Sequence, residues 1–132
     1  MEGQQEFEKR IARIRQEMRD KGLETLLVYE SGRHNFLRMN YVAYLTDFIS
    51  VGPETMLVVP LEDAPVLYLS PAWDIRRARE ESWVSDVRTF KEFWSRLPSI
   101  AGKVGIVGRE SMHAGLHDEI TKIGRASCRE RV

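Results

Sequence analysis

The residues best suited by type and spacing to chemistry are His113 and His117, four positions apart in the sequence. On a helix this spacing places both imidazoles on one face, as two ligands of a divalent metal would be. The zinc-peptidase motif His-Glu-x-x-His also needs a glutamate as general base, but position 114 is alanine and no third ligand is evident. We therefore interpret the pair as two exposed helix histidines, and predict neither metal ligands nor catalytic residues in this chain.

Other chemical motifs are incomplete. Three glycines at 102, 105 and 108 flank a predicted strand, whereas the glycines of dinucleotide and phosphate loops follow one. Residues 108–111 are therefore predicted to form a strand-to-helix turn. No serine stands in the nucleophile motif G-x-S-x-G. The three arginines between 76 and 79 precede two glutamates, which favours a solvated helix face over an anion site.

A weaker candidate site lies in an aromatic-rich segment. Asp47 lies in this segment, with Tyr44 just before it and His34 upstream. These three side chains can hydrogen-bond a polar ligand, so the stretch from His34 to Asp47 is a candidate pocket lining. The alternative for Asp47 is a turn, where aspartate is favoured because its side chain bonds the nearby backbone.

Composition excludes several classes of protein. The chain has 132 residues, about one domain, and is 42% hydrophobic and 30% charged, so it is neither disordered nor fibrous. Twenty basic and twenty acidic residues give zero net charge, which argues against a nucleic-acid partner bound through global charge. No apolar run approaches the ~20 residues of a membrane span, and the polar start of the chain is unlike a secretory signal. We expect no membrane partner and a cytoplasmic location.

The last ten residues are treated separately. Residues 123–132 (IGRASCRERV) resemble a sequencing-adapter oligonucleotide translated in frame, so we expect a native domain over 1–122 and a non-native tail over 123–132. Without the tail, which holds three arginines and one glutamate, the net charge falls from zero to −2. The tail also holds Cys128, the only cysteine. Because an adapter in frame interrupts the coding sequence, we expect the native protein to continue beyond Lys122.

Apolar periodicity predicts alternating helices and strands. The 4-3-4 spacing of apolar residues over 7–18 is typical of one helix face, and Gly22 is a suitable stop. Ser70 and Pro71 predict a helix start, Ser111 a cap for the last helix, and Trp73 and Trp94 are predicted to be core residues. A short helix is expected within 31–54, strands are expected at 26–29, 55–59, 65–69, 83–87 and 104–107, and further helices at 71–81, 90–97 and 112–120. This order predicts an α/β sandwich around a mixed sheet.

An ordered series of segments resembles the N-terminal domain of the creatinase, prolidase and aminopeptidase P family, the "pita-bread" hydrolases. Residues 10–23 have the form R-I-x-R-I-R-x-x-M-x-x-K-G-L and lead into a buried strand. Residues 40–48 (NYVAYLTDF) resemble the family's Asn-x-x-Tyr-Leu-Thr-Gly-Phe segment. The strands at 56–60, 65–69 and 104–108 resemble its central hairpin and final strand. The resemblance implies a mixed β-sheet flanked by helices, similar to a ribonuclease H-like sandwich.

The resemblance also implies a function. In this family the catalytic site lies in a larger C-terminal domain, where peptidase members bind two divalent metals (Mn, Co or Zn) and creatinase binds none. We therefore expect a non-catalytic half of a truncated Xaa-Pro peptidase or creatinase-like hydrolase, without a cofactor of its own. The N-terminal domain is expected to contribute to subunit association, as a homodimer, and to the wall of the active-site cleft, with His34, Tyr44 and Asp47 at its edge.

Two departures bear on the substrate. Residues 32–39 lengthen the connection before the Asn-x-x-Tyr segment, and Asp47 stands where the family commonly has glycine. Both fall where the domain approaches a substrate, so the substrate class stays open. A self-contained α/β module that binds a small ligand or a protein, and a small enzyme with an unrecognised site, are the alternatives. Sequence beyond Lys122 separates them.

Overall fold

The computed structural model describes residues 2–31, 40–50, 52–100 and 102–124. Five strands and five α-helices alternate along these residues in the order that the sequence predicts. The helices are α1 (Glu2–Lys21), α2 (Tyr41–Thr46), α3 (Ile75–Glu81), α4 (Phe90–Arg96) and α5 (Ala114–Gly124), and the strands are β1 (Thr25–Glu30), β2 (Glu54–Pro60), β3 (Val66–Ser70), β4 (Asp86–Thr89) and β5 (Val104–Val107). Short 3₁₀ helices precede α3 (η2, Ala72–Asp74), follow α4 (η3, Leu97–Ser99) and follow β5 (η4, Arg109–Ser111).

The strands form one mixed sheet in the order β4-β3-β2-β1-β5. The pairs β1–β2 and β2–β3 are antiparallel, the second as the short connection between β2 and β3 predicts, whereas β1–β5 and β3–β4 are parallel. β4 forms an edge, as predicted, although it starts three residues later than the sequence indicates. The predicted fold class, a mixed sheet flanked by helices, is confirmed.

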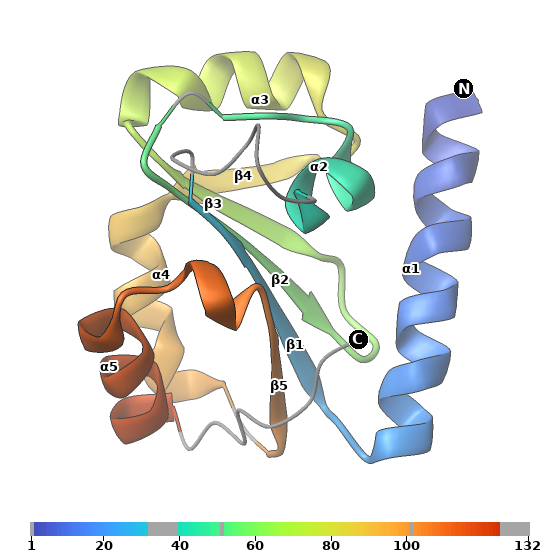
Figure 1. Ribbon diagram of the computed structural model, residues 1–132. Coiled ribbons are helices and arrows are strands. Elements are labelled where there is room, and N and C mark those ends of the chain that lie inside the picture. Colours follow the sequence, from blue (N-terminus) through green and yellow to red (C-terminus); the bar gives the residue numbers. More distant parts are fainter. Residues whose placement is uncertain (1, 32–39, 51, 101, 125–132) are drawn as a thin grey trace.

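Helices cover both faces of this sheet (Figure 1). One apolar core lies between the sheet and α1, α2 and α3, with Phe7, Ile11 and Met18 supplied by α1. The other lies beneath α4 and α5 and includes Phe93 and Leu116. Because β1 pairs on both edges and is covered on both faces, all six of its residues are buried, which explains its continuous apolar sequence.

Two predicted helix caps are wrong. Ser70 ends β3, its hydroxyl has no hydrogen-bond partner within the described chain, and η2 begins only at Ala72. Ser111 closes η4, and α5 begins two residues beyond the predicted start. The side chain that caps α5 is His113, whose Nδ1 accepts a hydrogen bond from the backbone N–H of Leu116 at 3.1 Å. A short 3₁₀ helix is involved in both errors, since η2 replaces the predicted first turn of α3 and η4 includes the predicted cap of α5.

We expect deletion of residues 123–132 to leave the melting temperature unchanged within error. The segment is polar and carries little apolar area to offset the entropy of ordering it. Residues 125–132 lie outside the described residues, and α5 ends at Gly124. Thermal unfolding of the full chain and the deletion variant tests this, and a drop of several degrees in the variant would show that the tail packs natively.

Candidate functional site

The predicted cleft edge is built on α2, a helix fixed at both ends by side-chain and backbone caps. The Asn40 side chain accepts a hydrogen bond from the Ala43 N–H at 2.9 Å. At the other end Asp47 adopts a left-handed conformation with φ of 56° and donates its N–H to the carbonyl of Ala43. Aspartate tolerates this region better than most residues, so a helix-ending turn can form where glycine is common in the resembling segment. The Asp47 side chain is exposed.

Tyr44 projects from the same helix and stacks on a cation. The Arg10 guanidinium carbon lies 4.1 Å from the centroid of the Tyr44 ring and 5.3 Å from that of Trp83. Arg10 also donates to the Tyr44 carbonyl and pairs with Glu6 at 2.7 Å. The hydrogen bond from Arg10 lowers the pKa of Glu6 below its ordinary value. This cluster ties α1 to α2 and fixes the face of the Tyr44 ring.

Behind Tyr44 lies a pocket of about 370 Å³ between α1, α2 and the sheet. Its lining is almost wholly apolar and includes Ile14, Leu45 and Val107. Tyr44 lines this pocket and Asp47 does not. His34 lies outside the described residues. The structure therefore puts two of the three predicted side chains on one short helix, but the adjoining pocket suits an apolar group better than a polar substrate.

The loop after α2 is held by a buried carboxylate. Asp74, only 1% exposed, accepts a hydrogen bond from the Ser50 hydroxyl at 3.0 Å and pairs with Arg77 at 2.8 Å. Arg77 also donates to the Ile49 carbonyl and lies over the Phe48 ring. The hydrogen bond to Asp74 raises the pKa of Arg77 further above its ordinary range.

The arginine cluster is therefore only partly the solvated face that the sequence predicts. Arg77 is tied to Asp74, and Arg79 donates to the Val87 carbonyl at 3.0 Å. Arg76, whose side chain is 90% exposed, and Arg79, which is also exposed, fit the prediction, whereas Arg77 is half-buried. Single-sequence reasoning missed these contacts because their partners are distant carbonyls and a carboxylate whose burial depends on the tertiary fold.

Among the described residues, three large hydrophobic side chains are exposed, and they lie on α2, in the loop that follows it and in η2. They are Tyr44, Ile49 and Trp73, with exposed fractions of 44%, 52% and 71%. The prediction of Trp73 as a core residue is wrong. On α3 the inward-facing residues are Ile75 and Ala78, three positions apart, and Trp73 does not share their spacing. That mismatch was the signal available in the sequence.

The two histidines are not equivalent. His113 is exposed and caps α5, whereas His117 is partly buried, and its Nε2 has no hydrogen-bond partner within the described chain. The prediction of two exposed histidines is thus wrong for His117. Across the described ranges, no three histidine, cysteine or acidic residues lie close enough to hold a metal ion.

A second, polar pocket of about 390 Å³ lies at the carboxyl ends of the parallel strands β1 and β5. Glu54, Glu110, Ser111 and His113 line it. The nearby Glu30, 3% exposed, accepts a hydrogen bond from the Ser111 hydroxyl at 3.4 Å. Strand ends of this kind often hold ligands in α/β folds, but no complete nucleophilic or metal constellation is formed by the side chains described here.

No helix in the described part of the chain is both long and apolar enough to span a bilayer.

Together these features define an α/β domain with a well-formed core and accessible side chains near α2. The family model for the creatinase/prolidase N-terminal domain matches residues 10–125, and the chain belongs to that family.

Solved structures have the same fold. A proline dipeptidase from Streptococcus agalactiae 2603V is similar with a TM-score of 0.72 and 19% identity, over 94% of this chain and 92% of that one. The creatinase/prolidase N-terminal domain of an X-Pro dipeptidase from Streptococcus pyogenes has a TM-score of 0.69 at 17% identity, over 92% of this chain and 98% of that one. No curated protein matches the chain.

The prolidase from Pyrococcus horikoshii OT3 is similar with a TM-score of 0.71 and 19% identity, over 94% of this chain. The aligned region is only 32% of that prolidase. The chain thus spans about a third of the length of this relative.

Proposed function

We propose that this chain is the non-catalytic N-terminal part of a longer Xaa-Pro peptidase or creatinase-like hydrolase. The observation that carries the proposal is the family match over residues 10–125 together with the alignment to about a third of a prolidase. In the longer protein, a C-terminal domain supplies the catalytic residues and, in a metallopeptidase, two divalent metal ions. The N-terminal domain contributes to a homodimer interface and to the wall of the cleft, and the protein is cytoplasmic.

The exposed side chains near α2 support the role in a cleft wall. Tyr44 on α2, Ile49 in the loop after it and Trp73 in η2 leave apolar area in water, and such area is available to another domain or a ligand. The caps of α2 and the Ser50–Asp74–Arg77 contacts hold these residues on an ordered scaffold. Residues in the wall of an active site need such a scaffold, because a side chain that moves cannot hold a substrate in one orientation.

The direct test uses the coding sequence downstream of Lys122. We expect the longer protein to hydrolyse an Xaa-Pro dipeptide or a creatine-like amidine, and the 132-residue chain to be inactive and to bind no stoichiometric Mn²⁺, Co²⁺ or Zn²⁺ in isothermal titration. A two-metal site needs several carboxylates and a histidine in one fixed cavity. Tight binding of one or two equivalents by the chain alone, abolished by His113→Ala, would contradict the proposal. A native stop codon soon after residue 122 would favour the binding module.

In the longer hydrolase, we expect His34→Gln, Tyr44→Phe and Asp47→Asn to raise KM or change substrate preference more than they lower the melting temperature. Tyr44→Phe removes the hydroxyl and keeps the ring on Arg10, and Asp47→Asn keeps a residue suited to the left-handed turn. Arg76→Gln, at a side chain that is 90% exposed on α3, is the matched control and should change neither quantity. If KM were unchanged in all three variants, these residues would not line the substrate cleft.

A further inference from the structure

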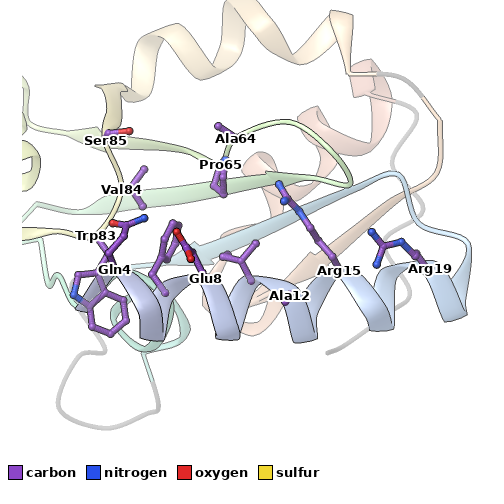
Figure 2. A pocket seen from close by; sticks show the side chains of 12 residues that line it. Gln4, Glu8, Ala12, Arg15, Arg19, Ala64, Pro65, Trp83, Val84 and Ser85 are labelled. Atoms are coloured by element: carbon purple, nitrogen blue, oxygen red, sulfur yellow. The ribbon is translucent and has the colours of Figure 1, made fainter. Parts of the chain in front are cut away.

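A groove of about 520 Å³ runs along α1 (Figure 2). One wall is α1 itself, from Gln4 to Arg19. The other is formed by the β2–β3 turn, at Ala64 and Pro65, and by residues 83–85 before β4. The fifteen steps from residue 4 to residue 19 of a helix span about 22 Å, so the groove is long rather than round. Its volume is within the range of ordinary small-molecule sites.

The middle of the groove is apolar. Phe7 and Ile11 from α1 and Val84 from the facing wall line it, and all three belong to the core beneath. Pro65 adds a rigid apolar surface from the turn, and Ala12 leaves space at the rim. Phe7, Ile11 and Val84 are nearly closed to water. A hydrocarbon chain laid in the groove would therefore lose water from its own surface and from the more accessible Ala12, Pro65 and Trp83, at roughly 25 cal/mol per Å² of apolar area.

The two ends of the groove differ in charge. Arg15 and Arg19 stand at one end, and Glu8 lies towards the other, beside Gln4 and Trp83 (Figure 2). Arg15 donates to the carbonyl oxygens of Pro60, at 3.1 Å, and Asp63, which fix its guanidinium on the turn. Over the described ranges, neither arginine is paired with a carboxylate. At the basic end, Arg15 is thus held in place but its charge is not neutralised by a carboxylate. At the opposite end, Glu8 would repel an anion.

We propose that this groove binds a linear amphipathic carboxylate, with its hydrocarbon chain over Phe7, Ile11 and Pro65 and its carboxylate at Arg19 and Arg15. Arginine suits this role because its planar guanidinium donates paired hydrogen bonds to a carboxylate. The polarity of the groove fixes the direction of the ligand. The proposal does not rest on the proposed hydrolase function, and the groove shares only Trp83 with the Arg10–Tyr44 stack among the residues named for each.

The test is isothermal titration of the intact 132-residue chain with octanoate below its micelle concentration. We expect one saturable site. 1-Octanol keeps the chain and lacks the charge, and acetate keeps the charge and lacks the chain. Each should bind at least about tenfold more weakly, since charge-assisted hydrogen bonds and apolar burial each contribute more than that factor.

Two variants locate the site. Arg19→Gln should weaken octanoate binding about tenfold or more, whereas Arg13→Gln, the same change at an exposed position of α1 outside the groove lining, should leave it unchanged. Ala12→Leu adds bulk at an exposed helix position and should also weaken binding without loss of stability. The proposal is overturned by absence of saturable binding, by equal affinity for octanoate and octanol, or by octanoate binding that neither groove variant weakens.

Discussion

Replacement of Leu27 by alanine is expected to lower the free energy of unfolding by about 2–5 kcal/mol, as is usual for a buried leucine. Leu27 has no exposed surface and lies in the middle of β1, beside Val58 of β2 and Ile106 of β5. Loss of three side-chain carbons there leaves a cavity, because paired strands on both sides and the helices above keep the backbone from closing it. Urea unfolding followed by circular dichroism measures the change.

Ile49→Ala is the matched control for this experiment. Its side chain is 52% exposed, so truncation removes little buried area and should change the free energy of unfolding by no more than about 0.5 kcal/mol. Equal losses in the two variants would show that β1 is not the centre of the core.

The local sequence was sufficient to predict the strands of the sheet, because a strand that is buried on both faces is a continuous apolar run. β1, β2, β3 and β5 are short apolar runs bounded by turn residues, and each is seen close to its predicted limits. The start of α1 at Glu2 lies outside the apolar period that predicted the helix. The helix ends at Lys21, just before Gly22, which has φ of +70°. Glycine adopts this left-handed conformation easily, and for that reason it is common just after a helix end.

The errors concern residues that lie in or just after short 3₁₀ turns. Trp73 is exposed because η2 turns it away from the Ile75–Ala78 face. The carboxylate that Arg77 meets, Asp74, is only three residues away, and what the sequence did not indicate is its burial beside Ser50. His113 caps α5 because η4 ends at Ser111, two residues before it, and α5 begins only at Ala114. Each case depends on a short 3₁₀ turn, and such turns have too few residues to show a period.

The same reasoning applies to the candidate site. The sequence identified Tyr44 and Asp47 as polar groups near each other, and both do lie on α2 and at its end. It could not indicate that the Tyr44 ring would rest on Arg10 or that the pocket behind it would be apolar, because those facts arise where α1, α2 and the sheet meet. We therefore expect Tyr44 to contact a substrate only through its hydroxyl and the exposed edge of its ring.

Gly108→Ala is expected to lower the free energy of unfolding by about 2–5 kcal/mol for two additive reasons. Gly108 has φ of +85°, a region that costs an ordinary residue about 1–2 kcal/mol. A β-carbon there would also stand 2.0 Å from the carbonyl oxygen of Tyr29 in β1. Overpacking against such a neighbour costs about 1–3 kcal/mol, and here the neighbour is backbone that cannot rotate away.

Gly22→Ala separates the two contributions. Gly22 has a similar φ of +70°, but no atom lies within 4 Å of the position of an added β-carbon, so only the conformational cost of about 1–2 kcal/mol should appear. Chemical denaturation of both variants gives the difference directly. A larger loss in Gly108→Ala establishes that η4 must approach β1 closely, which is what brings Ser111 and His113 beside Tyr29 at the polar pocket. Equal losses would mean that the turn can relax, and that this pocket is not held in shape by Gly108.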